Sequence, residues 1–229
     1  MRTSAAVSGV LAALLLVLVA VDWPPLTAFD RSIAEALHRS ALAHPGFTRL
    51  NRVLSDWPWD PWTMRALAAA TAALLWWRRE RRAALWVAGT TLLAAGLQQM
   101  LKSLVGRERP QWPDPVDSAR YAAFPSGHAM TATVACGLML WVLAVRWPEG
   151  RRGWGTLAGA AVLSVLGAGW TRVYLGVHWP TDVLGGWLIG WCCVCVAVLT
   201  YRWSERRPRR PSPGAAGGDV PGSRRGGKR

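Results

Sequence analysis

The segment 171–182, TRVYLGVHWPTD, carries three ionisable side chains between two long apolar stretches. An ionisable residue beside hydrocarbon is costly to bury, so it indicates a functional site by default. His178 and Asp182 stand four residues apart, and a helix that begins near Pro180 places both on one face. The carboxylate can then hold one imidazole nitrogen and leave the other free as a nucleophile. Arg172 adds a forked cation that suits phosphate oxygens.

Two further clusters of polar residues precede that segment. Lys102 and Arg109 provide a point charge and a second fork, and with the arginine of the first segment they can form a phosphate pocket. Ser126 is predicted to be the N-cap of an apolar run, so its hydroxyl and the amides of Gly127 and His128 lie at the positive end of a helix dipole. An anion binds favourably there, and His128 is well placed to protonate a leaving oxygen.

These clusters must be positioned by helices that cross a membrane. A hydrocarbon core of roughly 30 Å needs about 20 helical residues, and the chain contains six apolar runs near that length. We therefore predict an all-α, polytopic membrane protein, a bundle of six transmembrane helices with short interfacial helices. The first run is predicted to be an uncleaved span and not a signal peptide. The six predicted spans are 5–21, 64–77, 83–101, 128–145, 154–170 and 183–201.

The charge distribution predicts how the chain is oriented. The net charge of +14 does not indicate nucleic-acid binding, because the basic residues sit at span ends and not along a groove-binding element. By the positive-inside rule, the clusters at 78–82 and 146–152 are cytoplasmic. We predict a membrane-embedded domain over 1–202 and a disordered basic cytoplasmic tail over 203–229. Five cations would then be extracytoplasmic, against the positive-inside trend: Lys102, Arg107, Arg109, Arg120 and Arg172.

The segment 22–61 is predicted to lie in the membrane interface outside the cell. Its apolar residues recur at helical steps on both sides of the break at Pro45, which indicates two short amphipathic helices. Such a segment is either a vestibule for a lipid or a simple anchor. His38 and His44 are expected to be interfacial or solvated and not catalytic.

Helix packing in the second half of the chain is indicated by small residues. Glycines at four-residue spacing let helix backbones approach closely in lipid. The pairs are Gly155 with Gly159 and Gly186 with Gly190. The four cysteines all lie in predicted spans and indicate neither a disulfide framework nor a metal site.

The three clusters resemble the signature of the type 2 phosphatidic acid phosphatase family of integral membrane lipid phosphatases. The first motif, a lysine followed after six residues by Arg-Pro, is matched by Lys102 and Arg109. The second motif, Pro-Ser-Gly-His, is matched in full by residues 125–128. The third motif, Ser-Arg, five residues, His, three residues and Asp, is matched by Thr171, Arg172, His178 and Asp182, with threonine in place of serine.

The resemblance implies a cofactor-free, metal-independent hydrolase of lipid phosphomonoesters or pyrophosphates that works through a phosphohistidine. His178 would attack phosphorus with Asp182 fixing its tautomer, and His128 would protonate the departing oxygen and then activate water. The partners would be a phosphorylated lipid and the surrounding membrane lipids, at the outer face of the plasma membrane. Phosphate oxygens would be held by Lys102, Arg109, Ser126, Gly127 and Arg172.

Other readings of the same residues stay open. His128, His178 and Asp182 could be metal ligands, although no further carboxylate-rich cluster accompanies them. A transporter with an anion-selective mouth would carry ionisable groups deep in its spans, where this chain has little beyond Gln98 and Gln99. A phosphotransferase would share the first half of the reaction. The substrate, whether undecaprenyl pyrophosphate, phosphatidic acid or phosphatidylglycerol phosphate, is not determined, although a prokaryotic isoprenoid pyrophosphate is favoured.

Overall fold

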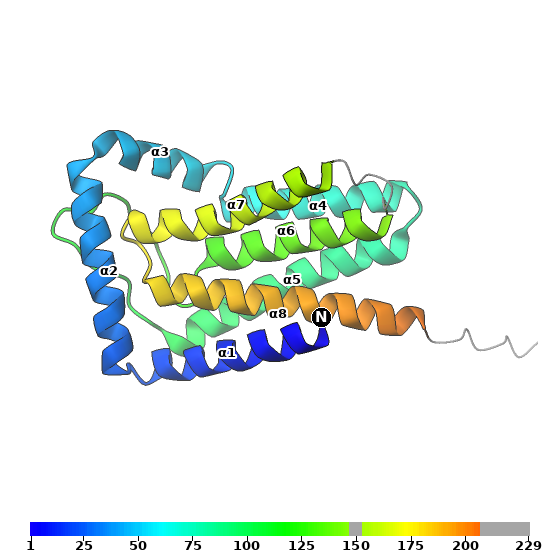
Figure 1. Ribbon diagram of the computed structural model, residues 1–229, viewed down its shortest axis with the longest axis horizontal. Helices are drawn as coiled ribbons and strands as arrows, with labels where there is room; N and C mark the ends of the chain where they lie inside the picture. The colour runs from blue at the N-terminus through cyan, green and yellow to red at the C-terminus, as the bar shows by residue number, and fades with distance from the viewer. Residues whose placement is uncertain (147–152, 207–229) are drawn as a thin grey trace, which may run out of the picture.

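The computed structural model describes residues 1–146 and 153–206, and this part of the chain is helical without strands (Figure 1). Proline at the first helical position starts four of the helices, where its missing N–H costs nothing. The eight helices are α1 (Arg2–Ala20), α2 (Pro24–Ala43), α3 (Pro45–Asp56), α4 (Pro61–Trp77), α5 (Arg81–Val105), α6 (Gly127–Arg146), α7 (Trp154–Tyr174) and α8 (Pro180–Glu205).

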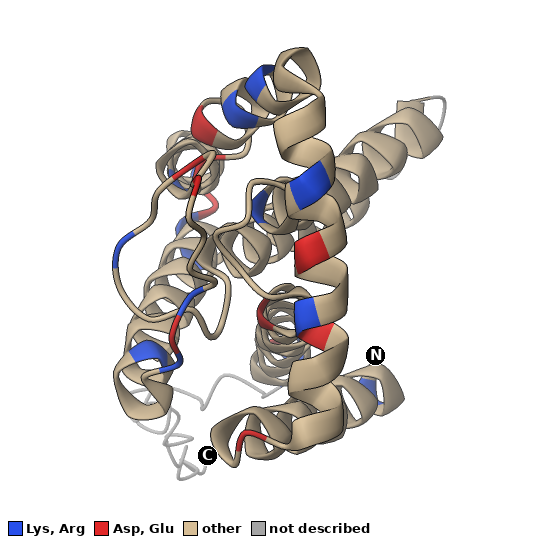
Figure 2. Ribbon diagram, turned by 90° about the vertical axis from the view of Figure 1, so that its left-hand side faces the viewer, with Lys and Arg blue, Asp and Glu red and all other residues tan. Residues whose placement is uncertain are grey.

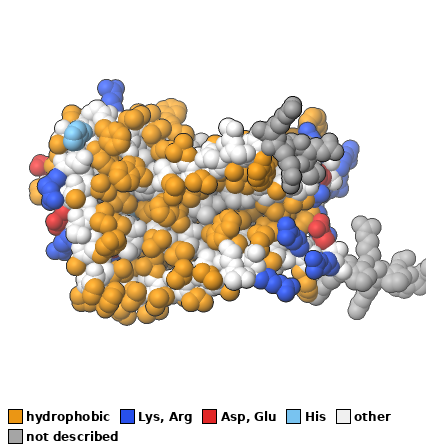
Figure 3. All heavy atoms as spheres, viewed as in Figure 1, with side chains coloured by type: hydrophobic (Ala, Val, Ile, Leu, Met, Phe, Trp, Pro, Cys, Tyr) orange, Lys and Arg blue, Asp and Glu red, His pale blue; other side chains and the backbone are white. Residues whose placement is uncertain are grey.

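Helices α1 and α4 to α8 run alongside one another, while α2 crosses one end of the bundle and α3 lies above that end (Figure 1). We call this end, formed by α2, α3, the loop 106–126 and the N-termini of α6 and α8, the site end. The opposite end, which carries the turn 78–80 and the C-terminus of α6, is the arginine end. Hydrophobic side chains cover the flank of the bundle, and charged ones gather at its two ends (Figure 3).

The predicted architecture, a helical multi-pass membrane protein, is confirmed, but the predicted number of six spans is not. Within residues 1–146 and 153–206, five helices are long and apolar enough to cross a membrane: α1, α5, α6, α7 and α8. Helix α4 has 17 residues and falls short of that length, so the sixth span stays a prediction. Helix α8 continues to Glu205, and the predicted tail lies outside the described residues from position 207 onward.

The core of the bundle is the contact between α6 and α8. Helix α6 is the most buried of the five spanning helices. A Cβ atom on Gly186 would lie 2.8 Å from the Ser126 carbonyl oxygen, and one on Gly190 would lie 3.0 Å from that of Met130. The predicted close approach is therefore present at this pair. It is absent at Gly155 and Gly159, because a Cβ there would meet nothing within 4 Å.

The two interfacial helices predicted between residues 22 and 61 are α2 and α3, which meet at His44. His44 is exposed as expected. His38 is not solvated, because its ring is buried and stacks on Trp112 with ring centroids 4.2 Å apart. The indole of Trp112 donates to the Gly176 carbonyl at 2.8 Å. These contacts hold helix α2 against the loops of the site end, so α2 is more than a surface anchor.

Candidate active site

The site end brings together segments from the whole chain. Figure 2 faces this end and shows charged residues along α2 and on the loop that crosses it. The C-terminus of α5, the loop 106–126 and the first turns of α6 and α8 meet here, so all three sequence clusters lie at the same end of the bundle.

His178 and Asp182 form a buried pair at the start of α8, which begins at Pro180 as predicted. The Nδ1 atom of His178 lies 3.3 Å from the Oδ2 atom of Asp182, and the two side chains are 2% and 0% exposed. The same oxygen accepts the Trp179 N–H at 2.8 Å. The carboxylate that caps the helix therefore also orients the imidazole.

The second nitrogen of His178 faces a cation. Its Nε2 atom lies 3.1 Å from Nη1 of Arg109, a group that can only donate, so Nε2 is an acceptor and Nδ1 carries the proton towards Asp182. Burial, followed by the positive charges of Arg109, Arg172 and Lys102, holds the pKa of His178 well below its usual value. The imidazole is therefore neutral near pH 7, with a lone pair on the nitrogen that faces the cations.

Three cations lie close enough to the His178 ring to act on it electrostatically, and backbone carbonyls accept from two of them. The Lys102 ammonium donates to the Ala122 carbonyl at 2.5 Å. Arg109 donates to the Tyr121 carbonyl at 2.8 Å and to the Val177 carbonyl at 2.5 Å. Burial, then the neighbouring Arg172, lowers the pKa of Arg109 to about 10. The site therefore holds a concentration of positive charge that favours an anion.

The third cation, Arg172, extends from the last turn of α7. Its Nη1 atom donates to the Ser55 hydroxyl at 2.8 Å and lies 3.4 Å from a carboxylate oxygen of Asp117. Its Nε atom is buried without a hydrogen-bond partner. The guanidinium therefore has donor capacity that neither neighbour uses.

The turn that opens α6 provides further donors. Helix α6 begins at Gly127, so Ser126 occupies the predicted N-cap position, and its hydroxyl oxygen is buried without a partner. The Ser126 N–H donates to the backbone carbonyl of Asp182 at 2.9 Å, which links the second cluster directly to the third. The ring of His128 lies near the backbone of Ser55, and Arg172, His178 and Arg109 are among its ionisable neighbours.

Two residues of the site were not identified from the sequence. Nη1 of Arg107 lies 2.6 Å from Oδ1 of Asp182, and its Nη2 lies 2.7 Å from Oδ2 of Asp30. In the sequence, Arg107 is distinguished only as a cation against the positive-inside trend, and Asp30 carries no signal beyond being a polar residue of an amphipathic helix. Among the described residues, no three His, Cys, Asp or Glu side chains converge as a metal site would require.

The sequence matches a known protein family. The model of the PAP2 superfamily matches residues 83–207, more than half of the chain. The chain belongs to the PAP2 superfamily. The matched range contains all three motifs, so the resemblance predicted from them is confirmed at the level of the family.

Curated PAP2 relatives align with part of this chain. Phosphatidylglycerophosphatase B of Bacillus subtilis is 38% identical over 109 residues, which are 46% of this chain and 50% of that protein. Undecaprenyl-diphosphatase of Sulfolobus acidocaldarius is 35% identical over 79 residues, 34% of this chain and 31% of that protein. Lipid A 1-phosphatase of Rhizobium etli is 29% identical over 124 residues, 49% of each. The chain thus spans half or less of the relatives it matches.

A solved PAP2 structure extends the comparison over the whole fold. The crystal structure of a transmembrane PAP2 type phosphatidylglycerolphosphate phosphatase from Bacillus subtilis superposes with a TM-score of 0.75. The match covers 87% of this chain and 98% of that one at 22% sequence identity. The architecture, a multi-pass helical membrane protein, is therefore shared.

Proposed function

We propose that this PAP2 chain is a metal-independent lipid phosphatase that hydrolyses a phosphomonoester or pyrophosphate lipid through a phosphohistidine. The observation that carries the proposal is the environment of His178, whose Nδ1 faces Asp182 at 3.3 Å and whose Nε2 faces Arg109 at 3.1 Å, with Lys102 and Arg172 nearby. An oriented, neutral imidazole beside an anion pocket is the arrangement that nucleophilic attack on a phosphate requires. The names of the aligned relatives, which are all lipid phosphatases, support the same class of reaction.

The proposed reaction has two displacements at phosphorus. The Nε2 lone pair of His178 forms a bond to phosphorus while the bond to the leaving oxygen breaks. His128, whose protonated form is favoured by the negative charge of the bound phosphate, gives its proton to that oxygen. His128 then takes a proton from water, whose oxygen attacks phosphorus, and the electrons of the P–N bond return to Nε2. Lys102, Arg109 and Arg172 hold the phosphate oxygens throughout, together with the Ser126 hydroxyl and the Gly127 amide.

The proposed location is the plasma membrane, with the site end outside the cell and the tail inside. The arginine end carries the cluster 78–82, and a positively charged end is retained in the cytoplasm. The substrate would then be a lipid of the outer leaflet whose phosphate projects into the interface. Among undecaprenyl pyrophosphate, phosphatidic acid and phosphatidylglycerol phosphate we favour the isoprenoid pyrophosphate. Labelling of single introduced cysteines, one at each end, by an impermeant reagent would test this orientation.

The test of the activity is phosphate release from these three lipids by the purified protein, with His178→Ala as the control. We expect release from at least one lipid, unchanged by a metal chelator. Brief reaction with a labelled substrate should leave acid-labile, alkali-stable phosphate on the wild-type chain and none on the variant. Loss of turnover on chelation would contradict the metal-free mechanism. Transfer of phosphate to an added acceptor lipid, with no free phosphate, would assign a phosphotransferase instead.

A further inference from the structure

A buried chain of three charged side chains connects helix α2 to the proposed nucleophile. Its members are Asp30, Arg107 and Asp182, and Asp182 in turn contacts His178. We propose that Asp30 and Arg107 are positioning residues, which hold Asp182 so that it presents His178 to the phosphate. The inference rests on the proposed function, because it assigns the groups that support the same histidine.

Asp30 is placed to fix the start of α8. Its Oδ1 atom accepts the Thr181 N–H at 2.9 Å, and its Oδ2 atom accepts the Thr181 hydroxyl as well as Arg107 at 2.7 Å. The first amides of a helix have no partner within the helix, and a carboxylate usually supplies one from the residue before it. Here α2 supplies that carboxylate from a distant part of the sequence. The first turn of α8, which carries Asp182, is thereby tied to α2.

Arg107 joins the two carboxylates with separate nitrogens. Nη2 contacts Asp30 and Nη1 contacts Asp182, with side-chain exposures of 8%, 1% and 0% for Arg107, Asp30 and Asp182. Its guanidinium also lies 5.7 Å from the ring centroid of Trp179, the N-cap residue of α8. Buried charges are tolerated only when they are paired and hydrogen-bonded, so each member of this chain requires the next. One cation thus compensates both acids.

Asp30, the member of this network farthest from His178, lies outside the residues that the family model matches. The PAP2 model matches residues 83–207, which include Arg107 and Asp182, whereas Asp30 belongs to α2. Helix α2 is held against the site end a second time by the stack of His38 on Trp112. The contacts that hold Asp182 therefore extend outside the matched range, into the N-terminal half of the chain.

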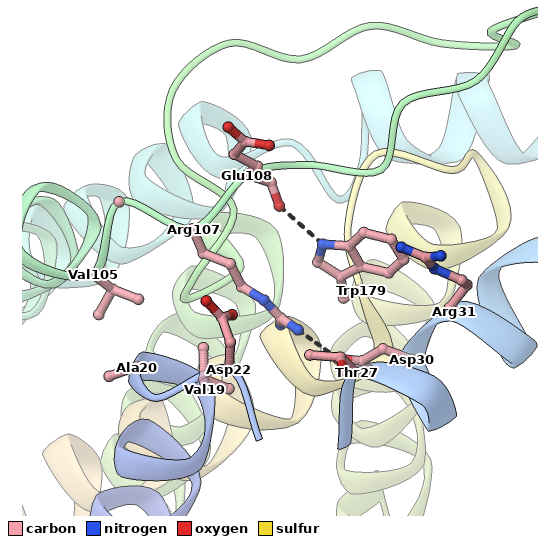
Figure 4. A pocket seen from close by; sticks show the side chains of 11 residues that line it. Val19, Ala20, Asp22, Thr27, Asp30, Arg31, Val105, Arg107, Glu108 and Trp179 are labelled. Atoms are coloured by element: carbon pink, nitrogen blue, oxygen red, sulfur yellow. Dashed lines mark hydrogen bonds and ion pairs between the residues drawn. The ribbon is translucent and has the colours of Figure 1, made fainter. Parts of the chain in front are cut away.

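A cavity gives experimental access to this network. A hollow of about 400 Å³ lies beside Arg107, and Asp30, Trp179, Asp22 and Arg31 are among its lining residues (Figure 4). Truncation of Arg107 would enlarge this hollow towards the two carboxylates. A guanidinium ion is small enough to enter it, so the missing cation can be supplied from solution.

The first test compares two carboxylates that line the same cavity. Asp30→Asn keeps the shape of the side chain and removes its charge, and we expect kcat to fall by about 10- to 100-fold with KM changed less than about threefold. Asp22→Asn is the matched control, because Asp22 is exposed and should leave both constants within about twofold. Wild-type kcat in Asp30→Asn, with an active wild-type enzyme, would overturn this inference and leave the proposed function intact.

The pH profile separates positioning from a general folding defect. The acid limb of kcat/KM reports protonation of His178 in the free enzyme. Loss of the cation in Arg107→Gln leaves the Asp182 charge uncompensated, so the limb should move to higher pH, while Asp30→Asn should move it slightly lower. If the acid limb of kcat/KM stays at the wild-type pH in both variants, the inference is contradicted. The charged or titratable groups that face His178 are Lys102, Arg109, His128, Arg172 and Asp182.

Chemical rescue completes the test within a single preparation. Arg107→Ala should lose about 10- to 100-fold in kcat and recover at least tenfold when millimolar guanidinium chloride is added. Urea has nearly the same shape without the charge and should not rescue. Recovery also shows that the variant is folded, whereas equal effects of urea and guanidinium, or no rescue, would overturn the role of the charge. If the wild-type protein is inactive on every lipid tested, the proposed function is contradicted, and so is this inference, which rests on it.

Discussion

The two ends of the bundle carry the same residue types in opposite environments. At the site end Lys102 and Arg172 are 8% and 5% exposed, close to other cations. At the arginine end the ion pair of Glu80 with Arg146 is 28% and 29% exposed. There Arg81 lies over the Trp76 ring at 5.4 Å, as arginines commonly do at a membrane surface.

The difference shows which charges serve stability and which do not. Exposed pairs and cation–π contacts at the arginine end cost little and stabilise little. Like charges buried together at the site end repel one another and are incompletely compensated, a cost that an anion would offset. Substitutions at the site end should therefore reduce turnover, while those at the arginine end should affect only stability, and weakly.

The largest effect is expected from His178→Ala, which removes the proposed nucleophile. Turnover should fall by at least about 10⁴-fold, measured as phosphate release under single-turnover conditions. His44→Ala, at the exposed junction of α2 and α3, is the matched control and should stay within about twofold of wild type. Residual turnover above one part in a thousand would argue against an attack by His178.

The cations provide the next comparison. Lys102→Ala should reduce kcat/KM by about 100- to 1000-fold, because one electrostatic contact to the phosphoryl group is lost. The melting temperature should not fall, since a buried ammonium next to Arg109 is removed. Arg81→Ala at the arginine end should leave kcat/KM within about twofold. Comparable losses of activity in both variants would break the distinction between the two ends.

The pH dependence should reflect the surroundings of His178. Only the neutral imidazole is a nucleophile, and burial together with Arg109 and Arg172 lowers the pKa of His178. A lowered pKa keeps the neutral form at more acidic pH, so the acid limb of kcat/KM should lie below the ordinary histidine value of about 6.5. Steady-state rates across the acid range check this. A limb above pH 6.5 would contradict the proposed environment.

The smallest effect is expected at the arginine end. Glu80→Gln breaks a partly exposed pair with Arg146 and should lower stability by about 0.2–1 kcal/mol, with turnover unchanged. Thermal unfolding in detergent at low and high salt would measure it, and the difference from wild type should shrink as salt screens the pair. A large loss of activity would show that the arginine end is coupled to the site.

Much of the fold was predictable because a helix that crosses the hydrocarbon core of a membrane must be about 20 residues long and mostly apolar. Five predicted spans coincide with helices that can cross a membrane, and the breaks at Pro45 and Pro180 are where the sequence placed them. The sequence could not show that a neighbouring helix packs closely against Gly186 but not against Gly155, because the spacing of glycines does not reveal which residues lie opposite them. That information exists only in the tertiary packing.

The site was predictable where chemistry depends on spacing along the chain. The four-residue spacing of His178 and Asp182 predicted their contact. His178 lies just before the N-cap residue Trp179, so the contact is made at the cap of α8 and not along a helical face. The contact of Asp30 with Arg107 joins residues 77 positions apart, so no local pattern could reveal it. The roles assigned to His128 and to the phosphate-binding residues stay predictions until the variants are measured.

The close packing of α6 against α8 has a consequence for the protein in its bilayer. A Cβ on Gly186 would meet the Ser126 carbonyl oxygen at 2.8 Å, and the Ser126 N–H bonds to the Asp182 carbonyl, so the two helices are joined backbone to backbone beside the reacting groups. Membranes of different thickness tilt helices at modest cost. Helices α1 and α5 bury less of their surface than α6 and α8, so we expect them to take up such tilting. The spacing of the groups at the site should then be the same in thin and thick membranes.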